Sequence, residues 1–194
     1  AEAAVGAASV KFQGVLDGQG HTIDNILIPD RVTWSKAPTA TTLGTIDTSK
    51  SYSYGGLVGR LGENGVIKNL NIGAGSKFEF YGTSGAFVGS HDGLVENCRN
   101  YADVKGYSCW IGGISGMVNK GGRIINCYNA GNITSGYANV GGIAGVSNGI
   151  IENCANTGDI AATALCTNYS NQRQRAGGIS GGGNGHTLKN CVNY

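Results

Sequence analysis

The sequence contains little proline and little charge. Only 2 prolines occur in 194 residues, and charged side chains make up 13%, about half of the usual share near 25%. The formal net charge of +2 is not gathered into blocks, which gives no reason to expect nucleic acid or an anionic membrane surface as a partner. No apolar run approaches the roughly 18 residues that span a bilayer, and residues 1–10 lack the pattern of a signal peptide. We therefore expect neither nucleic-acid binding nor membrane insertion.

Metal-ligating residues are also sparse. The 6 cysteines show no paired Cys-x-x-Cys spacing, and the 3 histidines lie far apart in the chain. His21 and His186 occur in similar phrases near opposite ends, GQGHTIDN and GNGHTLKN, where we expect them to cap turns, and His91 is expected in a turn. We predict no metal site and no cofactor.

Glycine, by contrast, is abundant and follows a repeat. The 35 glycines exceed twice the usual share of about 7%. The signature Gly-Gly-apolar-small-Gly, with one variant GAFVG, occurs at residues 55–59, 85–89, 112–116, 141–145 and 177–181. A second signature, apolar-x-Asn-apolar, follows each copy after 12 to 14 residues and also occurs once earlier, in HTIDNI. Its asparagines are Asn25, Asn69, Asn97, Asn126, Asn153 and Asn190, which sets a period of about 28 residues with two longer intervals.

The residues around each of these asparagines predict a bend. The residue two positions before the asparagine and the residue one position after it are apolar in every copy, whereas the residue between is mostly charged. Two inward positions three residues apart cannot lie on one straight strand, whose faces alternate. Asparagine tolerates the left-handed backbone conformation better than other non-glycine residues. We therefore expect the chain to bend at each asparagine, with the stacked amides forming a hydrogen-bonded ladder.

Three short strands separated by bends in about 28 residues predict one coil of a parallel β-helix. An α-helical fold conflicts with the glycine density, and the spacing of a dinucleotide-binding glycine loop is absent. We predict a single all-β domain over residues 1–194, with about six coils and with insertions at about residues 29–54 and 161–175.

Both signatures resemble a known repeat. Gly-Gly-[Leu/Ile]-x-Gly followed by Gly-x-[Ile/Val]-x-Asn-Cys is similar to the GLUG-motif repeat of bacterial surface proteins, and GVLDGQGHTIDNILI resembles the start of many bacterial right-handed β-helix repeats. The resemblance covers about residues 11–194 apart from the insertions. It implies a right-handed coil, a secreted or bacterial cell-surface location, and a place beside other domains of an adhesin-like protein or an immunoglobulin A-directed metallopeptidase. The chain has no His-Glu-x-x-His, so peptidase chemistry would lie outside it.

A cysteine column follows the ladder asparagines in the last four copies. Its members are Cys98, Cys127, Cys154 and Cys191. Metal-binding or redox thiols are one interpretation, because stacked coils bring such residues close together. Ile26 and Leu70 occupy the same position in the first two copies, which favours cysteine as a small buried apolar residue. Cys109 and Cys166 lie outside this column and could pair only if the second insertion folds back.

Binding residues are expected where the repeat is irregular, because insertions on a rigid solenoid commonly form binding surfaces. The candidates are aromatic and arginine side chains outside the predicted buried columns: Trp34, Tyr101, Tyr107, Trp110, Tyr128, Tyr137, Tyr169, Arg173 and Arg175. They could stack on sugar rings or anchor a protein partner. The alternative is that they only cover the ends and flanks of the rod.

The sequence favours a non-enzymatic extracellular interaction or spacer module that binds a glycan or a host protein. The alternative is a polysaccharide lyase or glycoside hydrolase, which needs clustered carboxylates for calcium or a suitably spaced carboxylate pair. Glu96 with Glu152, or Asp103 with Asp159, would lie two coils apart, roughly 9 to 10 Å. Solvated turn carboxylates explain both pairs, so we predict no catalytic residue.

Overall fold

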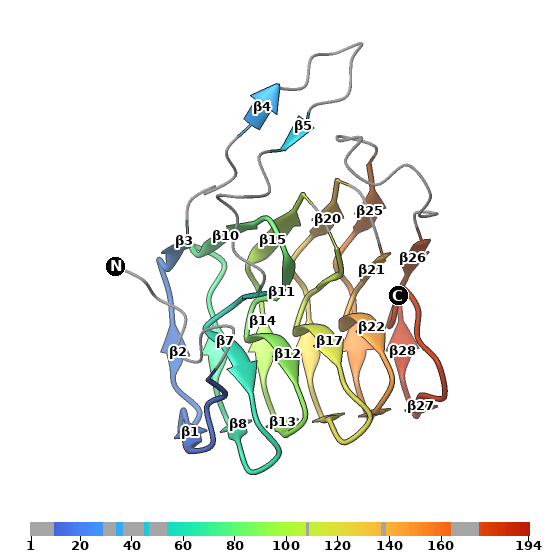
Figure 1. The fold of residues 1–194 in the computed structure, drawn as a ribbon. Helices are drawn as coiled ribbons and strands as arrows, with labels where there is room; N and C mark the ends of the chain where they lie inside the picture. The colour runs from blue at the N-terminus through green and yellow to red at the C-terminus, as the bar shows by residue number, and fades with distance from the viewer. Residues whose placement is uncertain are drawn as a thin grey trace.

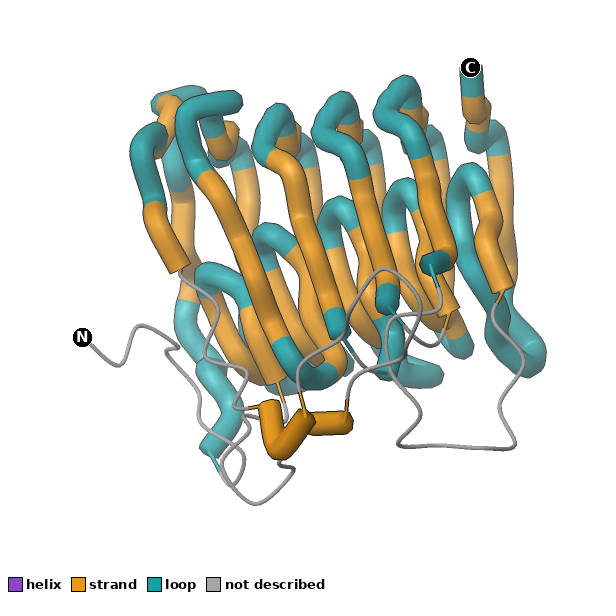
Figure 2. The backbone as a smooth tube through the Cα atoms, turned by 90° about the horizontal axis from the view of Figure 1, so that it is seen from above, coloured by secondary structure: helices purple, strands orange, loops and turns teal. Residues whose placement is uncertain are grey.

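The computed structural model describes residues 10–28, 34–36, 45–46, 54–107, 109–136, 139–163 and 175–194, and within these ranges the chain forms short strands joined by turns, with no helix. Figure 1 shows the strands wound into coils that follow one another along a single axis. Seen at right angles in Figure 2, the coils form successive arches. The predicted all-β fold, with parallel strands stacked as a β-solenoid, is confirmed.

Five parallel sheets run along the solenoid, and each takes one strand from successive coils. Sheet I contains β1 (Val15–Asp17), β8 (Val66–Lys68), β13 (Leu94–Glu96), β18 (Arg123–Ile125), β23 (Ile150–Glu152) and β27 (Thr187–Lys189). Sheet II contains β2 (Thr22–Ile23), β9 (Asn71–Ile72), β14 (Arg99–Asn100), β19 (Tyr128–Asn129), β24 (Ala155–Asn156) and β28 (Val192–Asn193). Sheet III contains β3 (Leu27–Ile28), β10 (Lys77–Phe80), β15 (Asp103–Gly106), β20 (Ile133–Ser135) and β25 (Ile160–Ala162). Sheet IV contains β6 (Tyr54–Gly55), β11 (Thr83–Gly85), β16 (Ile111–Gly112), β21 (Asn139–Gly141) and β26 (Arg175–Gly177), and sheet V contains β7 (Val58–Leu61), β12 (Val88–His91), β17 (Ser115–Val118) and β22 (Ala144–Ser147).

Four coils contain a strand of every sheet, and they begin at β6, β11, β16 and β21. Partial coils formed by β1–β3 and by β26–β28 flank them. The expectation of about six coils therefore holds only when both partial coils are counted. Each complete coil has five strands where three were expected. The glycine signature forms a corner between sheets IV and V, and the segment around the ladder asparagine contributes one strand to sheet I and another to sheet II.

Close backbone approach explains the glycines of this corner. In the copy at residues 112–116, Gly112 ends β16 and Ser115 begins β17, so the chain turns within the signature. A Cβ atom added to Gly112 would clash with the carbonyl oxygen of Ser115, and one added to Gly145 would clash with the backbone nitrogen of Ile111. The strands on either side of the corner thus lie too close for any side chain.

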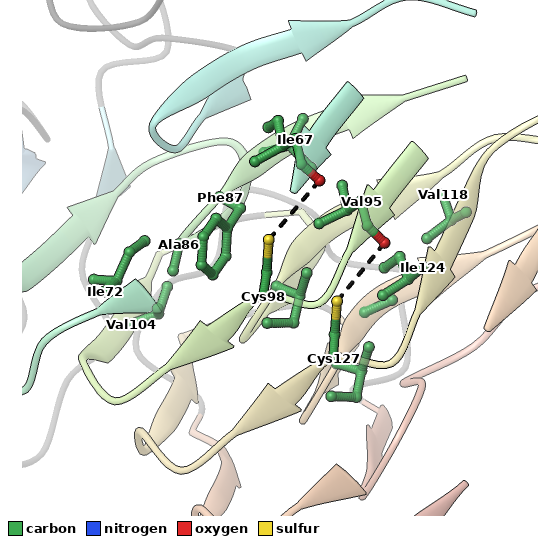
Figure 3. Packing of buried hydrophobic residues seen from close by; sticks show 14 of the residues in the cluster. Ile67, Ile72, Ala86, Phe87, Val95, Cys98, Val104, Val118, Ile124 and Cys127 are labelled. Atoms are coloured by element: carbon green, nitrogen blue, oxygen red, sulfur yellow. Dashed lines mark hydrogen bonds between the residues drawn. The ribbon is translucent and has the colours of Figure 1, made fainter. Parts of the chain in front are cut away.

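The apolar column two residues before each ladder asparagine forms the centre of the core. Ile67, Val95, Ile124 and Ile151 are paired in register in sheet I and are fully buried. Figure 3 shows Ile67, Val95 and Ile124 among the packed interior side chains, with the Phe87 ring close by. Burial of each such side chain contributes about 1.5 to 3 kcal/mol of transfer free energy, which makes this column a main source of stability.

The predicted register of the first coil was wrong. Leu16, and not Ile23, pairs with Ile67, whereas Ile23 pairs with Ile72 and is 39% exposed. Asn25 accordingly lies at the bend between sheets II and III, where the backbone N–H of Ile26 donates to the Ser76 hydroxyl over 3.0 Å. Asn25 does adopt the left-handed conformation, with φ of 57°. An asparagine bend is therefore not unique to one corner of the coil, and the sequence phrase alone gave the wrong corner.

The structure describes parts of both predicted insertions. In the first, β4 (Trp34–Lys36) and β5 (Thr45–Ile46) form an antiparallel pair that lies beyond the coils in Figure 1. Regular pairing continues past the predicted start of the second insertion, because the backbone N–H of Thr163 still donates to the Ser135 carbonyl over 2.7 Å. Arg175 begins β26 and so belongs to the solenoid.

Candidate interaction surface

The predicted asparagine ladder is present on the outside of the bend between sheets I and II. All its members after the first coil have φ between 50° and 54°, as the bend requires. The side-chain amide of Asn97 donates to Asn69 over 3.2 Å, and those of Asn153 and Asn190 donate to Asn126 and Asn153 over 3.1 Å each. In the first coil Gly18 stands where later coils have the ladder asparagine, and the neighbouring Asp17 carboxylate accepts from the Asn69 amide over 3.1 Å. These asparagines are therefore architectural.

A second ladder, entirely buried in the complete coils, was missed by sequence reasoning. Asn100 donates to Asn129 over 2.8 Å, Asn129 donates to Asn156 over 2.7 Å, and Asn156 donates to Asn193 over 2.7 Å. Each of the first three amides also donates to the backbone carbonyl two residues later. The signal was visible, since each of these residues follows a ladder asparagine by three positions. A buried amide at the core was not inferred because isolated buried polar groups are costly.

The cysteine column lies next to the core and contains thiols, not disulfides. Cys98 and Cys154 are buried, and their Sγ atoms donate to the carbonyls of Glu96 and Glu152 over 3.2 Å each. Figure 3 shows the further contacts of Cys98 with the Ile67 carbonyl and of Cys127 with the Val95 carbonyl. Burial raises the pKa of the Cys127 thiol, which keeps it protonated. The small buried role fits this column better than metal binding does.

Two cysteines and two histidines stand apart from this column. Cys166 lies outside the described residues, so the condition for its pairing with Cys109, that the second insertion folds back, is not tested. His21 is exposed and His186 is partly buried, and the two lie in the first and last partial coils.

His91 does not lie in a turn, as was expected, but ends β12 in the core. Its Nδ1 donates to the Gly93 carbonyl over 3.1 Å, whereas its Nε2 has no hydrogen-bond partner among the described residues. Desolvation lowers the pKa of His91 from 6.5 to about 4, although the Gly93 hydrogen bond and the nearby Asp92 charge both oppose the shift. The imidazole is therefore neutral at pH 7 and occupies a position that Leu61 and Val118 fill in the adjacent coils.

Two of the four carboxylates considered for catalysis, Glu152 and Asp103, are engaged in structural contacts. Glu152 accepts a hydrogen bond from Lys189 over 2.8 Å, and this contact lowers the pKa of the Glu152 carboxyl. A general acid needs a raised pKa, so the shift has the wrong direction. Asp103 accepts from the backbone N–H of Asn132 over 2.9 Å, and Asn132 in turn accepts from the N–H of Asp159 over 3.1 Å. These side chains cap the turns between coils.

The aromatic candidates separate into different environments. Tyr107 is only 6% exposed, so its expected place outside the buried positions was wrong; the Lys105 ammonium lies 4.9 Å from its ring centroid. Trp110 is half-buried. Tyr101, which directly follows β14, and Tyr128 of β19 come together at the edge of sheet II, with ring centroids 6.0 Å apart and planes at 67°. Of the described candidates, only this pair forms a cluster.

Comparisons with known proteins give one partial similarity. No protein-family model matches the chain, and no solved structure gives a significant match. The chain is similar to halomucin of Haloquadratum walsbyi (strain DSM 16790 / HBSQ001), with 33% identity over 116 residues, or 60% of this chain. These residues span about 1% of halomucin. The similarity is therefore to a small segment of a far longer protein and does not assign a family.

The remaining candidates cannot be placed at a site. Trp34 lies in β4, but its side chain is outside the described part of the structure, as are Tyr137, Tyr169 and Arg173. Arg175 is exposed at the start of β26. Across the described ranges, no group of three or more His, Cys, Asp or Glu residues is arranged to hold a metal ion. Within the same ranges, no helix has the length and apolar character to cross a bilayer.

Proposed function

We propose that this chain is a non-enzymatic interaction or spacer module of a secreted or cell-surface protein, of the GLUG-repeat type. The observation that supports this proposal most directly is that the same polar side chain forms hydrogen bonds between successive coils. Asn100, Asn129 and Asn156 each donate to the next coil over 2.7 to 2.8 Å. A stack of coils held by such contacts is a rigid rod. Each further coil repeats the same backbone arrangement, so the rod can be lengthened without a change of fold.

The comparison and the carboxylates agree with this role. Similarity to a small segment of halomucin, a name that describes a mucin, supports an extracellular location within a long polypeptide. The pairing of Glu152 with Lys189 and the turn contact of Asp103 argue against a catalytic carboxylate pair. We therefore do not propose a carbohydrate-active enzyme, but the experiments below test for that activity.

Location and turnover test the proposal separately. An antibody raised against the folded chain is expected to label intact, unpermeabilised cells of the producing organism or to detect the chain in their culture medium. Protease added to the intact cells should remove the cell-bound label. The purified chain should release neither reducing nor unsaturated sugar ends from polysaccharides. Exclusively cytoplasmic label would refute the extracellular role. Turnover abolished by Glu96→Gln or Asp159→Asn would instead establish the enzyme.

A further inference from the structure

One outward corner of sheet II differs from the regular repeat. The Tyr101 side chain is 38% exposed and meets the half-buried Tyr128 ring from the following coil, edge to face, at a centroid distance of 6.0 Å. Tyrosine offers a large, rigid contact surface with few rotatable bonds. The two rings thus form an aromatic corner open to solvent, which we name the tyrosine corner (Tyr101 and Tyr128).

The structure holds one of these rings in place. The Tyr128 hydroxyl is hydrogen-bonded to the Thr157 hydroxyl over 2.7 Å, one coil further on. In sheet II the residue paired with Tyr128 in that coil is Ala155, whose small side chain leaves room over the sheet. A ring already fixed before binding loses little conformational entropy when a ligand arrives. Tyr128 is therefore preorganised, and its edge-to-face contact supports the exposed Tyr101 ring.

A positive charge adjoins the corner. Arg99 is exposed, pairs in register with Tyr128, and stands two residues before Tyr101, so that both side chains project from the same face. Arg99 forms no ion pair with a carboxylate in the described part of the chain. The nearest acidic residues in sequence are Glu96 and Asp103, and Asp103 accepts a backbone hydrogen bond from the next coil. The guanidinium is thus available to an external carboxylate, which it can bind through two parallel hydrogen bonds.

We propose that Arg99 and the tyrosine corner bind a polysaccharide that contains uronic acid. The C–H face of a pyranose ring would stack on Tyr101, while the uronate carboxylate would pair with Arg99. Successive coils are about 4.8 Å apart, a spacing comparable to the length of one sugar unit, so a chain that follows the solenoid axis places successive sugars over successive coils. This ligand class rests on the proposed function as an extracellular interaction module.

Binding of defined polymers to the whole 194-residue chain tests the assignment. Calorimetry would compare polygalacturonate, alginate and hyaluronan with carboxyl-reduced polygalacturonate. Tyr101→Ala and Arg99→Gln should each weaken binding of the preferred acidic polymer about tenfold, which is the upper end for one aromatic contact and the lower end for a hydrogen bond to a charged group. Tyr101→Phe should retain binding, because it keeps the ring. Arg123→Gln is the matched charge control, since Arg123 is exposed on neighbouring sheet I, and it should bind like the unmodified chain.

The carboxyl-reduced polymer separates stacking from charge. It should bind the unmodified chain about tenfold more weakly than the acidic polymer, and Arg99→Gln should not weaken it further. The proposal is overturned if none of the three acidic polymers binds, if Tyr101→Ala binds normally, or if polyglutamate binds in place of the sugars. These measurements are independent of the cell-labelling result, so the ligand assignment can fail while the extracellular role stands. Equal thermal midpoints among the variants would show that each is folded.

Discussion

Acid should destabilise the solenoid through one buried histidine. His91 is fully buried, and its pKa is lowered from 6.5 to about 4. Between these two pH values the unfolded chain binds a proton at His91 that the folded chain does not bind. Stability contributed by the neutral imidazole is therefore fully present above pH about 6.5 and is lost progressively as the pH falls towards 4.

The size of this loss follows from the shift. One pKa unit corresponds to about 1.4 kcal/mol, so the change from 6.5 to about 4 amounts to roughly 3 kcal/mol. That is a large fraction of the 5 to 15 kcal/mol by which proteins of this kind are stable. Below pH about 4 both states carry the proton, and His91 causes no further loss.

Urea unfolding followed by circular dichroism from pH 7.5 to 4 would measure this slope. The variant His91→Leu should remove roughly 3 kcal/mol of the pH dependence while keeping stability at pH 7.5, because Leu61 already fills the paired position in the preceding coil and the unpartnered Nε2 atom disappears. His21→Gln, at an exposed histidine of the first coil, is the matched control and should retain the slope of the unmodified chain. An unchanged slope in His91→Leu would refute the reasoning.

Three further substitutions or treatments probe the repeat. Asn129→Ala should lower the free energy of unfolding by about 2 to 4 kcal/mol in urea titrations, because it removes two contacts to neighbouring coils and leaves buried amide groups unpaired; equal stability would show that the inner ladder adds nothing. Gly112→Ala should prevent folding or lower the thermal midpoint sharply, because its Cβ would clash with a backbone carbonyl. The control Gly121→Ala, whose Cβ meets its nearest atom at 3.4 Å, should be nearly neutral. Equal thermal midpoints for the two variants would contradict this reasoning. In the native chain iodoacetamide should modify half-buried Cys191 before buried Cys127, as read by peptide mass spectrometry, and the reverse order would contradict the burial of the column.

The repeat itself was readable because it rests on local rules. Asparagine after an apolar-x pair adopts the left-handed conformation at Asn69, and again at Asn97, with φ of 51° and 52°. A bend at every period, with apolar residues on both sides, already requires a stack of coils. The sequence was thus sufficient for the fold class and for most of the buried columns in sheet I.

The sequence did not show which bend of the coil a given asparagine occupies. Asn25 has the same backbone conformation as Asn69 but lies at another bend, because register is decided by which strands pair and not by the bend residue. The buried Asn129 amide was also missed, since its cost is offset only by partners in both adjacent coils. The sequence alone does not show that these asparagines face one another, because that depends on the register between coils. Tyr107 was misplaced for the same reason.

The stacking constraint also indicates where binding can evolve on such a chain. A column that supplies the same contact in every coil, such as the inner asparagines, cannot change at one coil without leaving a neighbour unpaired. Outward positions are free of this constraint and can differ from coil to coil, as Asn71, Arg99, Tyr128 and Ala155 do along one row of sheet II. A ligand that contacts several coils is then recognised by the order of these outward residues. Arg99 and Tyr128, one of the two rings of the tyrosine corner, lie on this row, which the repeat leaves free to vary.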